Sequence, residues 1–104
     1  MLANGMLANE CSREIRQNVP EAALYEQLAE ECVELAHAAL KLARIKRGEN
    51  PTPVSVGEAL GAVIEEYTDL RLVAYVIEIG FDIDVFEQKL LRWHKRLGEV
   101  NGDA

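Results

Sequence analysis

Two long segments, residues 18–47 and 55–79, carry apolar side chains at the three- and four-residue spacing of an amphipathic helix. No stretch of the chain shows the two-residue alternation that is typical of a half-buried strand. The prolines lie at or between the ends of the helical patterns, where they interrupt no helix interior. The sequence therefore predicts an all-α fold.

Capping residues set the expected limits of the first two helices. A weakly specified helix is predicted from about Leu7 to Gln17. Asn18 is expected to cap the second helix, which runs to Arg47 and ends where Gly48 follows. A polar loop with two prolines is then expected up to residue 54.

The other two helices also have sequence signals at their ends. Ser55, with a glutamate three residues later, predicts a capping box that starts a helix reaching about Ile79, just before Gly80. Asp84 is expected to cap the fourth helix, which is predicted to end before Gly98.

With 104 residues, the chain has room for a single hydrophobic core. We expect a helical bundle of two long and two shorter helices. Residues 1–17 would form an N-terminal extension with the weak helix, 18–98 the domain, and 99–104 a C-terminal tail. Because two long helices of one copy bury little apolar surface, we expect a homo-oligomer.

Composition excludes several classes of function. The chain has 11 Lys and Arg against 18 Asp and Glu, a net charge of −7, which argues against binding to duplex nucleic acid. The longest apolar run, residues 72–77, is too short to span a membrane. We see no signal-peptide pattern. Cys11 and Cys32 have no metal-type spacing, so we expect a reducing, cytoplasmic setting.

Carboxylates occur inside the apolar stripes of the two long helices. At about 100° per residue, Glu31 and Glu34 fall within the stripe of the second helix, and Glu66 and Asp69 within that of the third. Glu30 lies at the edge of its stripe. One such pair is common on a solvated face. Two pairs in phase with two apolar stripes predict a divalent cation, since converging carboxylates repel one another without one.

The ligand types indicate which metal this would be. A set made only of oxygen ligands suits Mg²⁺, with Mn²⁺ as the alternative. A di-iron site in a helical bundle needs a Glu-x-x-His motif, which the helix pair lacks. His37 and His94 are therefore expected on the surface.

These residues carry a resemblance to a known family. Residues 30–34 read E-E-x-x-E and residues 66–69 read E-x-x-D. Together they resemble the signature of the MazG-like, all-α nucleoside triphosphate pyrophosphohydrolase superfamily. This superfamily includes dimeric dUTPases, dCTP pyrophosphatases and phosphoribosyl-ATP pyrophosphatase. The resemblance covers residues 21–98. The 31 residues between the two motifs form a longer connection than is usual for the family, which leaves the subfamily open.

The resemblance implies cleavage of the bond between the α and β phosphates of a nucleoside triphosphate, releasing a nucleoside monophosphate and pyrophosphate. Carried over to this chain, it makes Mg²⁺ ligands of Glu31, Glu34, Glu66 and Asp69. Glu30 and Glu31 would be the catalytic carboxylates, with Glu30 as an accessory ligand or as the group that orients the attacking water. It also implies a homo-dimer or homo-tetramer.

Phosphate needs cationic partners as well as metal. Lys89, Arg92 and Arg96 lie along one edge of the apolar stripe of the fourth helix, whereas Lys95 lies about 180° from its centre. The alternative is an ordinary solvated basic helix end. Gln27, one turn before Glu31, is a candidate to bind substrate, or else an amide paired within the bundle.

Two other functions stay open on the sequence alone. One is a non-catalytic helical interaction module that retains the acidic cluster. The other is phosphoribosyl-ATP pyrophosphatase. A nucleotide panel assayed for pyrophosphate release separates these alternatives.

Overall fold

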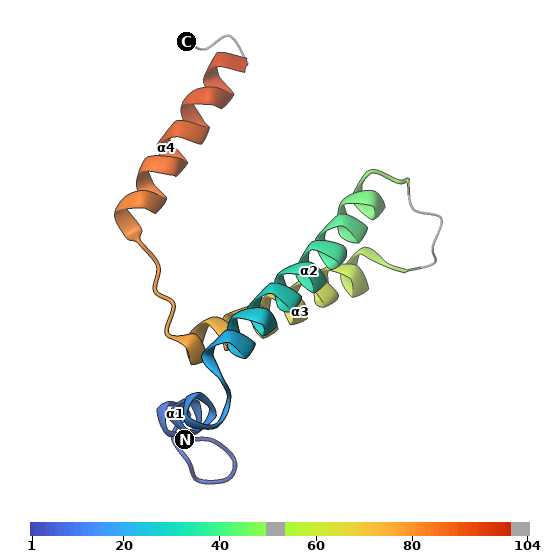
Figure 1. The fold of residues 1–104 in the computed structure, drawn as a ribbon. Helices are drawn as coiled ribbons and strands as arrows, with labels where there is room; N and C mark the ends of the chain where they lie inside the picture. Colours follow the sequence, from blue (N-terminus) through green and yellow to red (C-terminus); the bar gives the residue numbers. More distant parts are fainter. Residues whose placement is uncertain (50–53, 101–104) are drawn as a thin grey trace.

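The computed structural model describes residues 1–49 and 54–100. Within these ranges the chain forms four helices and no strand, as the sequence predicted. The helices are α1 (Ala8–Asn18), α2 (Glu21–Lys46), α3 (Val56–Ile77) and α4 (Ile83–Val100) (Figure 1). The all-α prediction, with two long and two shorter helices, is confirmed.

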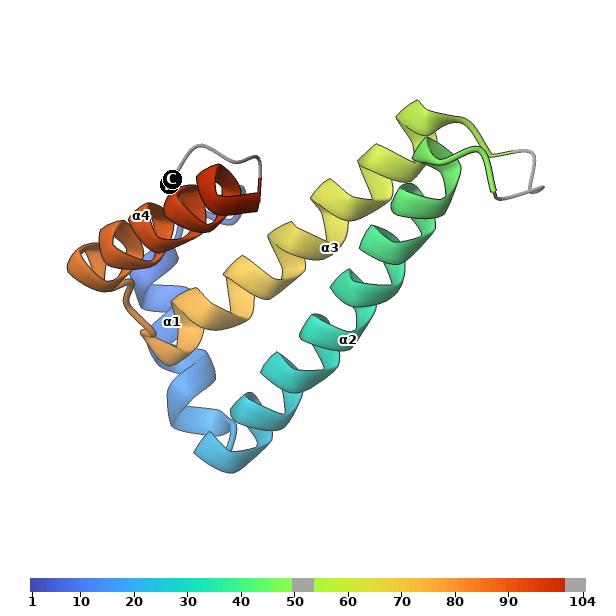
Figure 2. The same ribbon diagram turned by 90° about the horizontal axis from the view of Figure 1, so that it is seen from above.

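The two long helices form an antiparallel pair. α2 and α3 lie side by side along most of their lengths, and α1 packs against α3 near its end (Figures 1 and 2). Leu24 and Val76 are buried at the end of the pair near α1, and Ala59 is buried nearer the α2–α3 connection. The loop expected between α2 and α3 lies partly outside the described residues, which omit 50–53.

The predicted Ser55 cap of α3 is confirmed, whereas α2 ends at Lys46, one residue before the predicted Arg47. The Ser55 hydroxyl accepts a hydrogen bond from the backbone N–H of Glu58 at 3.1 Å and so caps α3. Gly48 has a φ of 73° just after α2, a left-handed conformation that costs glycine little.

The predicted cap of α2 is wrong. Asn18 is the last residue of α1, and its side-chain amide donates to the carbonyl oxygen of Glu14 at 2.7 Å. The N-cap residue of α2 is Pro20, which makes no side-chain capping bond. α1 runs one residue further than expected, so Asn18 belongs to the preceding helix, and residues 19–20 separate it from α2.

The end of α3 also differs from the prediction. The helix ends at Ile77, two residues before the predicted Ile79, and Glu78 adopts the left-handed conformation with a φ of 66°. An ion pair holds the Glu78 side chain, because Arg16 of α1 lies 3.1 Å from its carboxylate.

Both predicted limits of α4 shift by one or more residues. Asp82, rather than Asp84, accepts the capping hydrogen bond, from the backbone N–H of Val85 at 3.0 Å. α4 continues through Gly98 to Val100, because a glycine permits a helix end without imposing one. The expected tail therefore begins as helix, and residues 101–104 lie outside the described residues.

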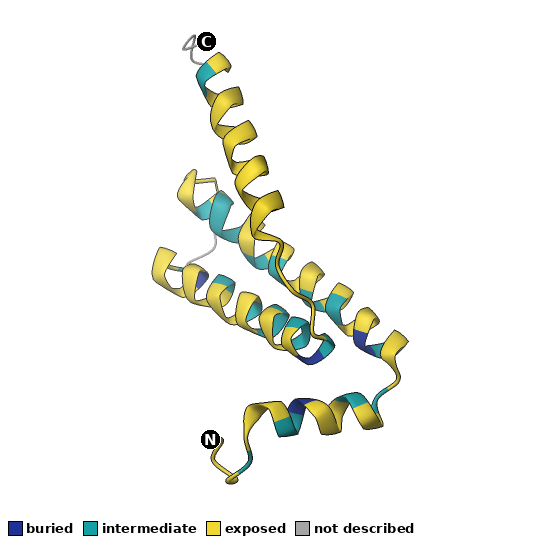
Figure 3. Ribbon diagram, turned by 90° about the vertical axis from the view of Figure 1, so that its left-hand side faces the viewer, coloured by how far each residue is buried: buried dark blue, intermediate teal, exposed yellow. Residues whose placement is uncertain are grey.

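The predicted bundle is present only in part. α4 projects away from α2 and α3 and forms no packed interface with another helix of the described chain (Figure 1). The radius of gyration is 18.5 Å, against about 13 Å for a compact domain of this length. Figure 3 shows exposed residues along nearly the whole of α4. The extended residues 79–82, after the left-handed turn at Glu78, direct the helix away.

Arg16 fastens α1 to the end of α3. Its guanidinium donates to the Ser12 hydroxyl at 2.7 Å and to the carbonyl oxygen of Val76 at 3.1 Å, besides pairing with Glu78. The carbonyl of Val76 is one of the last in α3, where no backbone N–H follows to bond it. This one side chain therefore both orients α1 and completes the end of α3.

We predict that Arg16→Ala loosens α1 while leaving the α2–α3 pair intact. Losing charge-assisted hydrogen bonds at a half-buried site should lower the free energy of unfolding by about 1–2 kcal/mol. Hydrogen exchange should speed up at the amides of α1 and stay unchanged in the middle of α2. Arg13→Ala, an exposed arginine on the same helix, is the matched control. Equal exchange in both variants would contradict the assigned role of Arg16.

Candidate metal centre

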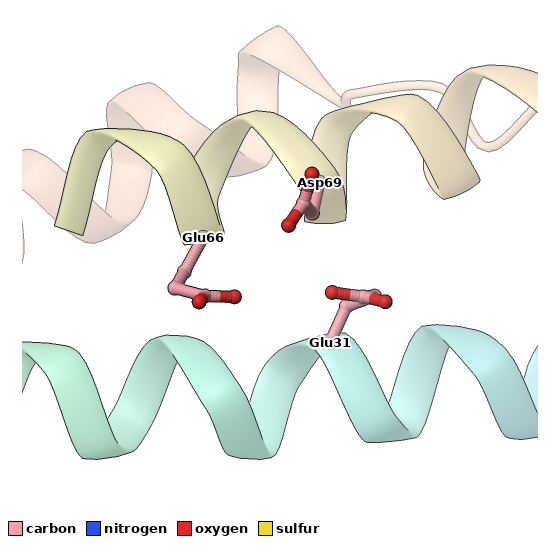
Figure 4. A group of neighbouring side chains, drawn as sticks. All are labelled: Glu31, Glu66 and Asp69. Atoms are coloured by element: carbon pink, nitrogen blue, oxygen red, sulfur yellow. The ribbon is translucent and has the colours of Figure 1, made fainter. Parts of the chain in front are cut away.

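Three of the predicted ligands meet between the two long helices. Glu31 of α2 and Glu66 and Asp69 of α3 each offer an oxygen, and these atoms lie within 4.8 Å of one another. Figure 4 shows the three side chains converging in the space between the helices. They meet because they share the apolar stripes through which α2 and α3 pack. All three residues are half-buried. We refer to them as the acidic triad.

The triad is electrostatically unfavourable when it holds no cation. Partial burial raises the pKa of Glu66, and the negative charges of Asp69, Glu34 and Glu31 raise it further, in that order. Glu65 adds to the same effect. The folded chain therefore holds a carboxylate where negative charge is disfavoured, which is what a bound cation would reverse.

Gln27 takes part in the site through Glu31. Its side-chain amide donates to a carboxylate oxygen of Glu31 at 2.7 Å, one turn along the same helix. This bond fixes the orientation of one triad carboxylate. The predicted contact of Gln27 with substrate stays a prediction, because the structure shows only this positioning contact.

The other predicted carboxylates lie beside the triad. Glu34 and Glu30 are both exposed on α2. Glu34 is outside the group of converging oxygens, although its charge still raises the pKa of Glu66. As a metal ligand, Glu34 stays a prediction. Glu30 faces the solvent, which suits a group that contacts water.

The predicted phosphate-binding residues are not brought to the triad within one copy of the chain. Lys89, Arg92 and Arg96 are exposed on α4, which does not pack against α2 or α3 in the described residues. The same projection exposes Trp93. The predicted surface positions of His37 and His94 are confirmed, since both are exposed.

A largely apolar cavity of about 290 Å³ adjoins the triad. Glu31 and Asp69 form part of its lining, together with Leu24, Leu72, Val76 and Ile15 of α1. Ile15 is not among the predicted site residues, because the sequence pattern of α1 is too weak to predict which helix it packs against. Its place in the wall depends on the contact of Arg16 with the end of α3, which is 60 residues away along the chain.

The donor set of the triad fits a hard divalent cation. The three groups offer only carboxylate oxygens, the ligands that Mg²⁺ and Mn²⁺ prefer, and no histidine or cysteine joins them in the described residues. Mg²⁺ usually keeps several waters and binds only one or two protein carboxylates plus phosphate. A half-buried group of three carboxylates leaves room for such ligands.

The chain was compared with family models, curated protein sequences and solved structures, and none of them matches it. The family resemblance therefore rests on the two motifs and the triad that they form. None of the helices in residues 1–49 and 54–100 combines the length and apolar character that a membrane crossing requires.

We predict that Glu66→Gln stabilises the metal-free protein. Because the folded-state pKa of Glu66 is raised, the folded state binds more protons than the unfolded state between the two pKa values, and stability falls as pH rises through that window. The variant removes this penalty. In chelator at about pH 7.5 it should melt above the wild type, and the difference should vanish at about pH 4. Glu26→Gln, an exposed carboxylate elsewhere on α2, should show no such gain. A lower melting temperature for Glu66→Gln in chelator would contradict charge repulsion in the triad.

Proposed function

We propose that this chain is a Mg²⁺-dependent nucleoside triphosphate pyrophosphohydrolase that works as a homo-oligomer, a dimer or a tetramer. The convergence of Glu31, Glu66 and Asp69 from two helices carries the proposal. The same residues belong to the E-E-x-x-E and E-x-x-D motifs that resemble the MazG-like superfamily. Cys11 and Cys32 are both free, which fits a reducing, cytoplasmic setting.

The triad and Glu34 would hold Mg²⁺, and Mn²⁺ could replace it. When bound, the metal would neutralise negative charge on the phosphates and make a water more acidic. α2 and α3 together carry nine carboxylates and only four cations, so their net negative charge would repel a triphosphate that came without a metal. This charge balance explains why a nucleotide would be accepted only together with a divalent cation.

The chain's own carboxylates would position the water and take its proton. Glu30 is exposed on α2 next to Glu31, so it can contact a water that a buried group could not reach. In the proposed reaction, water attacks phosphorus, the bond between the α and β phosphates breaks, and the proton passes to Glu30. Gln27 keeps Glu31 in place by its hydrogen bond. The products are a nucleoside monophosphate and pyrophosphate.

The decisive experiment is a nucleotide panel with Mg²⁺. The panel contains ribonucleoside and deoxyribonucleoside triphosphates, the diphosphates, and phosphoribosyl-ATP, the substrate of the histidine-pathway alternative. Pyrophosphate release is read as phosphate that appears only after inorganic pyrophosphatase is added. We expect release from at least one triphosphate. A folded oligomer that releases none, with Mg²⁺ or Mn²⁺, would support the non-catalytic interaction module instead.

We predict that Asp69→Asn and Glu34→Gln each lower pyrophosphate release by about a hundredfold or more, since each removes charge that positions the cation. Both variants should stay folded, because removing a charge from a crowded cluster relieves repulsion. Glu26→Gln is the control for the loss of a carboxylate from α2. Near-wild-type turnover of Asp69→Asn would contradict the proposed ligand set.

We also predict that Mg²⁺ raises the melting temperature of the wild type. A cation present at about a hundred times its dissociation constant stabilises the folded state by about 2.7 kcal/mol, which raises the melting temperature of a domain of this size by about 12 °C. Protein concentration and ionic strength are held constant. Asp69→Asn should lose most of this gain. Identical wild-type melting curves in chelator and in Mg²⁺ would exclude a metal site in the free protein.

A further inference from the structure

The apolar stripe of α4 has no partner in the described chain. It consists of Ile83, Phe86, Leu90, Trp93 and Leu97, all of them exposed. Trp93 is the extreme case, with 72 % of its surface exposed. An isolated helix of 18 residues is only marginally stable in water, so α4 needs packing to stay helical. Something must therefore cover this stripe.

The exposed area is what a second copy would remove. The chain exposes 8244 Å², whereas a compact monomer of its mass exposes roughly 5,800 Å². Two copies that covered this excess against each other would bury roughly 4,800 Å² in total, which is in the range of obligate homodimers. This area is thus large enough for a permanent interface between two copies.

The charges favour α2 and α3 of the second copy as the surface that receives α4. α4 carries four cations and three carboxylates, whereas α2 and α3 together carry nine carboxylates and four cations. α2 and α3 also expose apolar side chains on their outer faces, among them Val33, Leu40 and Ile64. Each chain therefore has an uncovered apolar stripe on α4 and an uncovered apolar surface on its α2–α3 pair. A symmetric pair of copies satisfies both.

The cations of α4 connect the packing between copies to the acidic triad. Lys89, Arg92 and Arg96 line one edge of the α4 stripe, and their own triad is beyond the reach of a helix that projects away. We propose that α4 of each copy packs on the α2–α3 pair of a second copy, and that these three cations hold the phosphates at the second copy's triad. The phosphate contact rests on the proposed function; the packing of α4 does not.

Sedimentation of the full chain tests the packing without any assay of activity. The wild type should sediment as a dimer or tetramer. A variant with Leu90→Glu and Trp93→Glu should sediment as a monomer, because both charges fall on the stripe. Lys95→Glu, on the opposite side of α4, is the matched control and should keep the wild-type size. A monomeric wild type, or an unchanged oligomer in the double variant, would overturn the proposal.

Mixing two inactive variants tests the shared site. One variant carries Asp69→Asn, and the other carries Arg92→Ala with Arg96→Ala. If carboxylates and cations come from different copies, subunit exchange should create intact sites, about one in four, and restore about a quarter of wild-type turnover. If both come from the same copy, every mixed oligomer stays inactive.

The two experiments distinguish failure of the shared site from failure of the proposed function. Restored turnover supports the shared site. A mixture that stays inactive after subunit exchange, shown by sedimentation of differently labelled copies, overturns it. If the wild type releases no pyrophosphate from any nucleotide, the proposed function has failed, and sedimentation alone then decides whether α4 packs on a second copy.

Discussion

The packing of α2 against α3 is the constraint on which the rest of the structure depends. The stripes that bury Leu24, Ala59 and Val76 also contain Glu31, Glu66 and Asp69. Apolar contact between the helices therefore forces the carboxylates together, and the raised pKa of Glu66 is the direct result. The hydrophobic effect supplies the free energy that holds this repulsive group in place. The carboxylates that would bind the cation thus destabilise the same helix interface that brings them together.

Helical periodicity predicted three of the carboxylates that converge, but it also included Glu34, which does not join them. At about 100° per residue, Glu31, Glu66 and Asp69 fall within the apolar stripes of their helices, and the structure brings them together. Periodicity places Glu34 in the same stripe as Glu31, but it does not predict how far α2 and α3 are shifted relative to each other along their axes. That shift depends on the connection between α2 and α3 and on the packing, and it leaves Glu34 outside the triad.

Helix ends and the position of α4 were harder to predict, for physical reasons. Asp82 and Asp84 are equally good caps, and only the backbone path selects between them. α3 ends before Glu78 and not just before Gly80, because an ion pair with Arg16 of α1 stabilises a left-handed conformation that the side chain of Glu78 disfavours. The amphipathic pattern of α4 predicts one apolar face but does not show what packs against it.

The contact of Arg16 with Val76 also has a consequence for how the chain folds. The two residues are 60 positions apart, whereas α2 and α3 are neighbours in the sequence and meet through shorter loops. Closing a long loop costs more chain entropy than closing a short one, so the antiparallel pair should form before α1 attaches. During synthesis α1 emerges first, yet its anchor emerges only after α3 is nearly complete. The wall that Ile15 provides is therefore the last part of the cavity to be assembled and, because few contacts hold it, the first to open.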